Sequence, residues 1–436
     1  MFLGLWQALA QDFKIYTEHP RLLLRPQRLR LLKREKERQS MRWLQFEMLM
    51  AGKAAMPEPG FALALYYQVS GNKEAGQEAV NWALGASADL RQAALVFDWC
   101  QPVLSEQQSQ ALAGRLQRGI EQTARSNSLA DARARVLAAV ALADHLPGVS
   151  ESALQSVVER WWNREMVPAL KAGRNLVVRD DLYALFEMLH VARDNLNLDL
   201  REPVPGFFKP LPLYHLMSYY PASYPAAENE YRIPAGREAQ PDLRAAALSR
   251  AAEFAMLAYD PNIVETQYLQ GWLMHDRFLL RGAFGIPYEF LWANPYHPGL
   301  SYYNLPLVFH DELFGRLFLR SSWDDDARWL GYFDRQLQVF EKGEPRIVPL
   351  KSAANPMVIG DAAVIAARSP LRFRLKGEVN VVFVIGLEPR RGYDVEVDDE
   401  EMREETTDRG GILTLAFPGG LRGGVRIKPG PRSSQS

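Results

Sequence analysis

The chain has 436 residues, and 47% of them are hydrophobic. This content excludes a largely disordered protein and is sufficient for a sizeable core, and the length suggests about two or three domains. The 51 basic and 52 acidic residues leave a formal net charge of -1, without the basic excess typical of nucleic-acid-binding proteins. We therefore expect no nucleic-acid partner.

The single cysteine, Cys100, excludes an internal disulfide and the zinc sites that are built from pairs of cysteines. No stretch reaches the roughly 18–20 consecutive apolar residues that cross a bilayer, so we expect no membrane span. Glycine-rich phosphate loops and metal-binding helix motifs do not occur in a credible context, and we expect no cofactor.

The first segment, residues 1–12, is apolar and contains Ala8-Leu9-Ala10. Signal peptidase reads an Ala-x-Ala ending, although the basic region that opens a signal peptide is missing. The segment is either a signal-peptide remnant or an ordinary helix start. The first alternative implies a periplasmic or extracellular protein.

Residues 13–305 are predicted to form a helical domain. Apolar residues recur at helical spacing, for example over residues 112–120 and 154–162. Pro26 suits a first helical turn, and Ser105 with the glutamine three residues later has the pattern of a capping box. Many medium-length helices joined by short loops, without intervening strands, predict an all-α layered array.

The most basic run, residues 28–38 (RLRLLKREKER), is interrupted by leucines at helical spacing. We interpret it as the solvated face of a helix rather than a nucleic-acid surface.

Two aromatic stretches lie in the second half of the helical domain. Pro203–Pro241 holds eight prolines and many tyrosines, and a loop this long is often functional. Helical patterning resumes over Leu243–Tyr259, and a second aromatic stretch, Trp272–Tyr303, leads out of the helices.

Beyond about Val308 the pattern becomes that of short strands divided by turns, which predicts an antiparallel β-domain over residues 306–430. The tail, residues 431–436, is predicted to be disordered or a remnant of expression. The strand-like runs are Phe314–Trp323, Arg328–Phe333, Gln336–Phe340, Leu371–Leu375, Val379–Ile385, Tyr393–Val397, Ile412–Phe417 and Val425–Ile427.

Three stretches carry a resemblance to a known family. They are HPRLLL at 19–24, FDWC at 97–100 before a Leu-Ser-Glu-Gln helix start, and LRSSWDDDA at 319–327. In this order they resemble the heparinase II/III-like polysaccharide lyases, a family that includes alginate and heparin lyases, and the chain is a divergent member by this comparison. The resemblance implies an α+β multidomain fold, in which an incomplete (α/α) toroid is followed by an antiparallel β-sandwich.

The resemblance also implies a reaction. Such lyases cleave uronate-containing polysaccharides by β-elimination, with a base, a tyrosine acid, and Asn, Arg or His side chains that neutralise the sugar carboxylate. The family's Asn-Asn-His falls near Asn127, where the histidine is missing. Asn127 either caps the following helix or contacts substrate. The family's His-x-His-x-Asp falls near Tyr332–Phe340, which contains no histidine, so we expect no family-type zinc site.

The tyrosine-rich loop supplies the remaining catalytic candidates. Tyr231 or Tyr220 is the candidate acid or base. Asn229, Arg232 or His275 is the candidate group that neutralises the carboxylate. For any single tyrosine of this loop, ordinary packing is the alternative that the sequence favours.

The candidate substrate-binding residues combine rings that can stack on sugars with groups that can read hydroxyls and carboxylates. They are Asn127, Tyr183, Trp272, Arg277, Glu289, Trp292, Asn294, Tyr296 and His297. Tyr183, Glu187 and His190 recur on one helix face, which either borders a cleft or forms a buried polar rib. The second aromatic stretch as a whole could also be a domain interface.

We therefore predict an exported carbohydrate-active protein whose partner is an acidic polysaccharide or oligosaccharide and whose activity is that of a lyase. One alternative is a glycan-binding protein of the same fold that has lost the chemistry. Another is a glycoside hydrolase, which needs two carboxylates about 5–10 Å apart across a cleft. Glu228, Glu230, Asp276 and Glu289 are its candidates.

Overall fold

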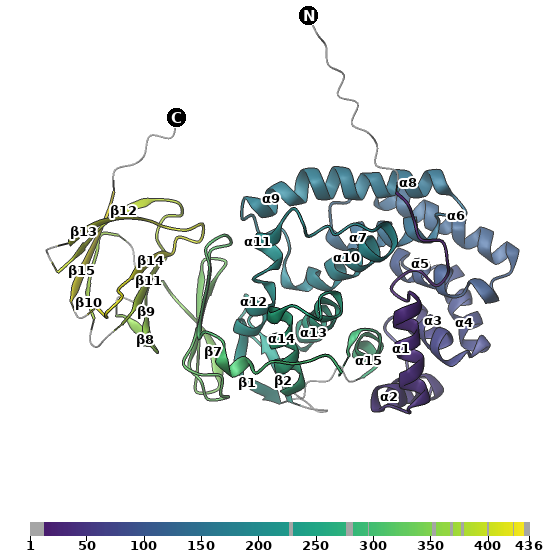
Figure 1. The fold of residues 1–436 in the computed structure, drawn as a ribbon, viewed down its shortest axis with the longest axis horizontal. Helices are drawn as coiled ribbons and strands as arrows, with labels where there is room; N and C mark the ends of the chain where they lie inside the picture. Colours follow the sequence, from purple (N-terminus) through teal and green to yellow (C-terminus); the bar gives the residue numbers. More distant parts are fainter. Residues whose placement is uncertain are drawn as a thin grey trace, which may run out of the picture.

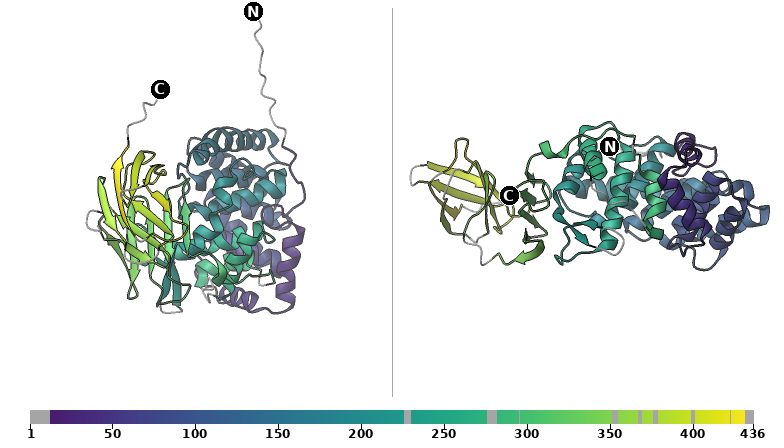
Figure 2. Two further views of the ribbon diagram at one scale, coloured as in Figure 1. Left: turned by 60° about the vertical axis from the view of Figure 1, so that its left-hand side comes forward. Right: turned by 90° about the horizontal axis from the view of Figure 1, so that it is seen from below.

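The computed structural model describes residues 13–225, 230–275, 282–294, 296–350, 355–366, 369–375, 379–398, 401–421 and 423–430. Helices make up the N-terminal part and strands the C-terminal part, and the strands lie at one end of the helical region (Figure 1). The same arrangement is visible from two further directions (Figure 2).

Helices account for most of the described chain up to residue 292. No described helix is both long and apolar enough to cross a membrane. The α-helices are α1 (Pro26–Glu37), α2 (Met41–Ala51), α3 (Pro59–Ser70), α4 (Lys73–Leu84), α5 (Leu90–Trp99), α6 (Glu106–Thr123), α7 (Leu129–Ala141), α8 (Pro147–Gln155), α9 (Val167–Lys171), α10 (Leu182–Leu196), α11 (Pro205–Phe208), α12 (Leu211–Met217), α13 (Leu243–Tyr259), α14 (Val264–His275) and α15 (Gly282–Trp292). The 3-10 helices are η1 (Gln101–Val103), η3 (Arg179–Asp181) and η4 (Tyr302–Asn304), and η2 (Ser156–Met166) is a π-helix.

Several helix boundaries follow from local sequence. Pro26 lies in the first turn of α1, and Ser105 and Gln108 form both hydrogen bonds of the predicted capping box of α6. The prediction that Asn127 could cap α7 is wrong. Ser128 occupies the cap position, and its hydroxyl accepts a hydrogen bond from the backbone N–H of Asp131.

The tyrosine-rich segment is not one long loop. It contains α11, α12 and an antiparallel hairpin of β1 (Tyr219–Pro225) and β2 (Glu230–Pro234). The expectation of a helical region without strands is therefore wrong at this point. The hairpin places Arg232 opposite Ser223.

The C-terminal strands form three sheets. The first has the order β3 (Val308–Asp311), β4 (Arg316–Arg320), β5 (Trp329–Phe333), β6 (Gln336–Glu341), β7 (Glu344–Val348). The second has the order β14 (Leu413–Ala416), β11 (Val381–Ile385), β9 (Ala362–Ala366), β8 (Met357–Ile359). The third has the order β10 (Leu371–Arg374), β15 (Gly424–Pro429), β12 (Gly392–Val397), β13 (Glu401–Thr406).

The sheets stack as successive layers beside the helices (Figure 1). One face of the first sheet contributes Phe318, Trp329 and Phe340 to the core of the helical region. Its other face packs on the second sheet, and the second sheet packs in turn on the third. The pairing is antiparallel throughout these sheets except between β9 and β11, which run parallel. The prediction of antiparallel strands is therefore wrong for this one pair.

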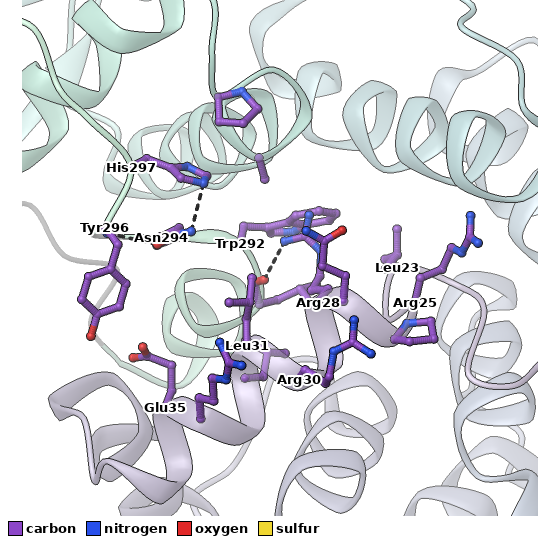
Figure 3. Close-up of a pocket in the computed structure, with 18 of the residues that line it drawn as sticks. Leu23, Arg25, Arg28, Arg30, Leu31, Glu35, Trp292, Asn294, Tyr296 and His297 are labelled. Carbon is purple, nitrogen blue, oxygen red and sulfur yellow. Dashed lines mark hydrogen bonds between the residues drawn. The ribbon is translucent and has the colours of Figure 1, made fainter.

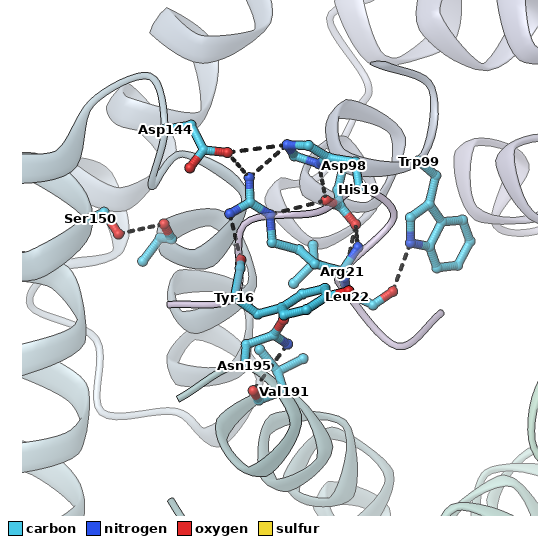
Figure 4. A network of polar contacts seen from close by, with 11 residues as sticks. Tyr16, His19, Arg21, Leu22, Asp98, Trp99, Asp144, Ser150, Val191 and Asn195 are labelled. Carbon is cyan, nitrogen blue, oxygen red and sulfur yellow. Dashed lines mark hydrogen bonds and ion pairs between the residues drawn. The ribbon is translucent and has the colours of Figure 1, made fainter. Parts of the chain in front are cut away.

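A buried carboxylate attaches the N-terminal segment to the helices (Figure 4). The Asp98 side chain, at the end of α5, has no exposed surface. Its Oδ2 accepts hydrogen bonds from the backbone N–H groups of Arg21 at 2.9 Å and Leu22 at 2.8 Å, and its Oδ1 lies 2.6 Å from Nδ1 of His19. The indole of Trp99 donates to the Leu22 carbonyl at 2.8 Å. Two of the stretches that carry the family resemblance therefore bind each other.

The guanidinium of Arg21 completes this network. It is fully buried, with Nε 3.5 Å from Oδ1 of Asp98. It also pairs with the half-exposed carboxylate of Asp144 and donates to the Tyr16 carbonyl at 2.9 Å. A buried cation needs these acceptors, because its removal from water is costly.

We predict that Asp98→Ala lowers the free energy of unfolding by about 3–5 kcal/mol, because it leaves the buried backbone N–H groups of Arg21 and Leu22 without an acceptor and removes the carboxylate that faces His19 and the Arg21 guanidinium. Urea denaturation followed by circular dichroism measures this change. Asp324→Ala, which removes an exposed aspartate, is the control and changes stability by at most about 0.5 kcal/mol. A loss below about 1 kcal/mol for Asp98→Ala would contradict the assignment.

Candidate functional site

Side chains from four segments converge where the helices meet the first sheet. We call them the junction cluster, and they are Arg232 of β2, His275 of α14, Tyr302 and Tyr303 of η4, and Arg320 and Trp323 at and after the end of β4. Three of these segments are far apart in the sequence, so the cluster exists only in the folded chain.

The rings of the junction cluster have a buried side and an open side. The His275 ring centroid lies 5.9 Å from that of Tyr302 and 6.2 Å from that of Tyr303. The two tyrosine rings stack at 4.6 Å, and Trp323 meets Tyr302 edge-on at 5.3 Å. Tyr302 is 5% exposed, whereas Tyr303 is 50% exposed and His275 is also exposed. A ligand can therefore approach from the side of Tyr303 and His275.

Two arginines give the junction cluster a positive charge. Arg320 is 3% exposed, and its guanidinium lies 4.4 Å over the Trp323 ring. It donates a long hydrogen bond of 3.5 Å to the Leu216 carbonyl. In the described part of the chain its Nε has no hydrogen-bond partner and no carboxylate pairs with it. Burial, followed by the charge of Arg232, lowers the pKa of Arg320 to about 10. Arg232 itself pairs with the exposed carboxylate of Asp325.

The buried tyrosine is held in its protonated form. Burial raises the pKa of Tyr302, and a hydrogen bond with Tyr303 raises it further. The charges of Arg232 and Arg320 act in the opposite direction but are the smaller effects. At neutral pH this phenol can donate a proton but does not act as a base.

The sequence predicted part of this cluster. Arg232 and His275 were candidates, and the structure brings them to the same region. Tyr302, Tyr303 and Arg320 were missed as site residues. The two tyrosines lie at the end of the second aromatic stretch, which was a signal for them. Arg320 lies in the LRSSWDDDA stretch, which was used only for the family resemblance.

Tyr220 does not belong to the cluster. It is 3% exposed, its hydroxyl donates to Oε1 of Gln338 at 2.8 Å, and its ring stacks on Phe340 at 5.5 Å. These contacts join the hairpin to the first sheet, so the catalytic role predicted for Tyr220 is wrong in this arrangement and its role is packing.

Three predicted residues cannot be placed by their side chains. Asn229 and Arg277 lie outside the described residues. The backbone of Tyr231 pairs with Tyr224 across the hairpin, and its side chain is outside the described part. Their predicted roles stay predictions.

The Tyr183 face is a buried polar network rather than a cleft border. The Tyr183 hydroxyl donates to Glu187 at 2.6 Å and accepts from the indole of Trp292 at 3.1 Å. Glu187 is fully buried and binds Arg91 at 2.6 and 2.8 Å and Arg133 at 2.8 Å. Tyr183 therefore contributes to helix packing, and a direct sugar contact predicted for it is wrong.

Trp272 lies in a second buried polar cluster. Its ring is 4.6 Å from that of Tyr219 and 4.7 Å below the guanidinium of Arg250. Tyr219 donates to Glu253 at 2.8 Å, and Nδ1 of His215 lies 2.9 Å from the same carboxylate oxygen. Since Trp272 is 4% exposed, it supports the fold and is not accessible to a sugar.

Four predicted substrate-binding residues line one groove instead of the junction cluster (Figure 3). They are Trp292, Asn294, Tyr296 and His297, and they face helix α1 across a cavity of about 650 Å³. Tyr296 is 67% exposed, and Nδ2 of Asn294 lies 2.9 Å from Nε2 of His297.

The remaining two predicted residues lie elsewhere. Glu289 is buried within α15, which is not the position of a catalytic carboxylate. Asn127 is exposed ahead of α7 and lines neither the groove nor the junction cluster.

Within the described ranges, no group of three or more His, Cys, Asp or Glu side chains could hold a metal ion. A scan against protein-family models finds no match to the chain, and a search of curated proteins finds none either.

We predict that stability falls with acidification between about pH 6.5 and 4. Burial, and then the Arg179 charge, lower the pKa of His215 to about 4, below its unfolded value of about 6.5. Between these values the unfolded chain binds the extra proton, so acid favours unfolding. His215→Gln is expected to reduce the slope of unfolding free energy against pH near pH 5 by about 1.4 kcal/mol per pH unit.

The matched control for His215 is Ser249→Ala, which changes the same cluster without removing a titrating group. Denaturation curves at a series of pH values measure both slopes. An unchanged slope in His215→Gln, with a normal slope in the control, would show that His215 is not buried in its neutral form.

Proposed function

We propose that the chain is an exported, heparinase II/III-like carbohydrate-active protein that cleaves an acidic, uronate-containing polysaccharide by β-elimination. In this proposal the helices form an incomplete (α/α) toroid and the sheets behind them a β-sandwich. The observation that carries the proposal is the buried Arg320, whose charge acts together with that of Arg232 on Tyr302, in a cluster where Tyr302 also contacts Tyr303 and His275.

The charge of the junction cluster favours an anionic ligand. Arg320 is a buried cation without a carboxylate partner in the described chain, and Arg232 has one that is 69% exposed. A sugar carboxylate that displaces Asp325 gains charge-assisted hydrogen bonds to arginine without bringing a new unpaired charge into the site. The half-exposed Tyr303 ring offers a face on which a sugar can stack.

Each group then has one task in the reaction. His275 takes the proton from the carbon next to the carboxylate, and the electron pair left behind forms a double bond to the neighbouring carbon. The glycosidic oxygen leaves that carbon and receives a proton from the Tyr302–Tyr303 pair. Arg320 and Arg232 stabilise the negative charge that builds up on the carboxylate oxygens.

A glycan-binding protein without this chemistry is the alternative. The groove described above favours that alternative, because its exposed Tyr296 offers a ring on which a sugar can stack. Of the carboxylates that the hydrolase alternative needs, Glu289 is buried, which does not favour a catalytic role for it. The side chains of Glu228, Glu230 and Asp276 lie outside the described part, and their roles stay predictions.

We predict that the protein produces unsaturated uronates, detected by the ultraviolet absorbance of the new double bond, from at least one member of a polyuronate panel. Arg320→Ala lowers kcat by about 100- to 1000-fold, because it removes the buried cation that stabilises the transition state. Tyr302→Phe lowers kcat by about 100-fold or more, because it removes the proton donor.

Arg328→Ala is the control, since it removes an exposed arginine near the same turn and leaves activity unchanged. Measurable binding of polyuronates by the wild type, with no rise in absorbance on any of them, would contradict the lyase proposal and support the glycan-binding alternative.

A further inference from the structure

The basic run of residues 28–38 is not simply a solvated helix face, because it lines one wall of the groove of Figure 3. We call this cavity the arginine groove. Seven arginines line it, against the two carboxylates of Glu35 and Asp194, which leaves a formal charge of +5 in a chain whose net charge is -1. The arginines are Arg25, Arg28, Arg30, Arg34, Arg38, Arg42 and Arg193.

Three of these arginines form a row along α1. Arg30, Arg34 and Arg38 are four residues apart, so they recur on one side of the helix about 6 Å apart along its axis. All three are exposed. Among the described residues, Arg30 and Arg34 have no side-chain hydrogen bond or ion pair, and Arg38 has one long contact of 3.5 Å to the Tyr296 hydroxyl. In the described chain, the charges of Arg30, Arg34 and Arg38 are therefore exposed and contribute little to holding the fold together.

Two of the other arginines that line the groove, Arg25 and Arg28, are held in place by the fold. The Arg28 guanidinium lies 4.5 Å over the Trp292 ring and donates to the Leu291 carbonyl at 3.2 Å. Arg25 donates to the Asp194 carbonyl at 2.5 Å. These contacts hold α1 against α10 and α15, so the exposed row lies on a rigid support.

The opposite wall has the groups that sugars use. Tyr296 is 67% exposed with its ring 5.9 Å from the Arg38 guanidinium, and Leu31 is 42% exposed on the helix side. Asn294 and His297 hydrogen-bond to each other beside the ring. Burial lowers the pKa of His297, so this imidazole is neutral near pH 7 and offers hydrogen bonds rather than charge.

We propose that the arginine groove is a second binding site, which holds an acidic glycan by the charges of successive sugars. The spacing of the row is close to the length of one pyranose in a chain, so carboxylates or sulfates on neighbouring sugars can each meet one arginine. A nucleic acid is less suited, because its bases need several stacking rings, and among the described residues that line the groove only Tyr296 is an exposed aromatic.

The groove is separate from the junction cluster but close to it. No junction residue lines it. Gln270 of α14 donates to the Asn294 carbonyl at 3.3 Å, whereas His275 at the end of the same helix contacts Tyr302. Five residues of helix correspond to about 8 Å, so one glycan chain can reach both sites. The inference rests on the proposed function for the class of ligand, an acidic glycan. It does not require that the protein cleaves this ligand.

The test is the affinity of the full chain for a fluorescently labelled hexauronate, measured by anisotropy at low salt. Arg30→Ala/Arg34→Ala is expected to weaken binding by about tenfold or more, because two charge-assisted hydrogen bonds are lost. Lys33→Ala/Lys73→Ala removes the same charge from exposed positions that do not line the groove, and should change affinity by less than about twofold.

Two further probes test the ligand class. A hexasaccharide whose carboxylates are reduced to alcohols should bind at least about tenfold more weakly than the hexauronate. A single-stranded oligonucleotide of equal charge that bound as tightly as the hexauronate, with the same loss in Arg30→Ala/Arg34→Ala, would overturn the assignment to glycans.

The anisotropy measurement reports binding and does not depend on cleavage. Its result can therefore be told apart from that of the absorbance assay for the lyase proposal. A groove variant that bound the hexauronate as tightly as the wild type would overturn this inference, even if uronates were cleaved. Specific loss of binding in the groove variant would support it, even if no polyuronate were cleaved.

Discussion

The buried carboxylate of Asp98 determines where the chain enters the helical region. It accepts two backbone hydrogen bonds from residues 21–22 and pairs with His19, and Trp99 next to it binds the Leu22 carbonyl. Helix α1 begins only four residues later, at Pro26. The direction of α1, and with it the row of arginines along the groove, therefore depends on this attachment. The contacts of Arg25 and Arg28 with α10 and α15 then fix the helix along its length.

A second constraint is the position of the first sheet. The indole of Trp329 donates to the Met217 carbonyl at 2.8 Å, and Tyr220 binds Gln338, so β5 and β6 are attached to α12 and the hairpin. These contacts bring the end of β4, with Arg320, beside Tyr302. A tyrosine that was predicted to be catalytic thus has a different role, since it helps to place the arginine that the proposed reaction needs.

The sequence predicted local elements well where one residue pattern dominates. Each strand-like run after Val308 contains a strand, and α13 has the predicted bounds of Leu243–Tyr259. Hairpin β1–β2 was missed because proline and tyrosine hide strand periodicity. Strand β9 was also missed, and its parallel pairing with β11 leaves no local pattern in the sequence. The order of the layers does not follow from periodicity at all.

The candidate site residues overlap only in part with those that the sequence singled out. Composition drew attention to the segment from Trp272 to Tyr303, but it could not separate a buried ring such as Trp272 from an exposed one such as Tyr296. It also could not show that the basic helix face borders a cavity, because the opposite wall comes from residues more than two hundred positions later. Arg320 is buried without a carboxylate partner among the described residues, and this is a property of the folded chain only.

The most direct test of the account is a crystal structure of the Tyr302→Phe variant with a bound oligouronate. The account predicts one sugar carboxylate at Arg320 and Arg232, in place of Asp325, with the neighbouring glycosidic oxygen facing residue 302 and the carbon-bound proton facing His275. A well-ordered oligouronate that binds only outside the junction cluster, with the ion pair between Arg232 and Asp325 intact, would contradict it.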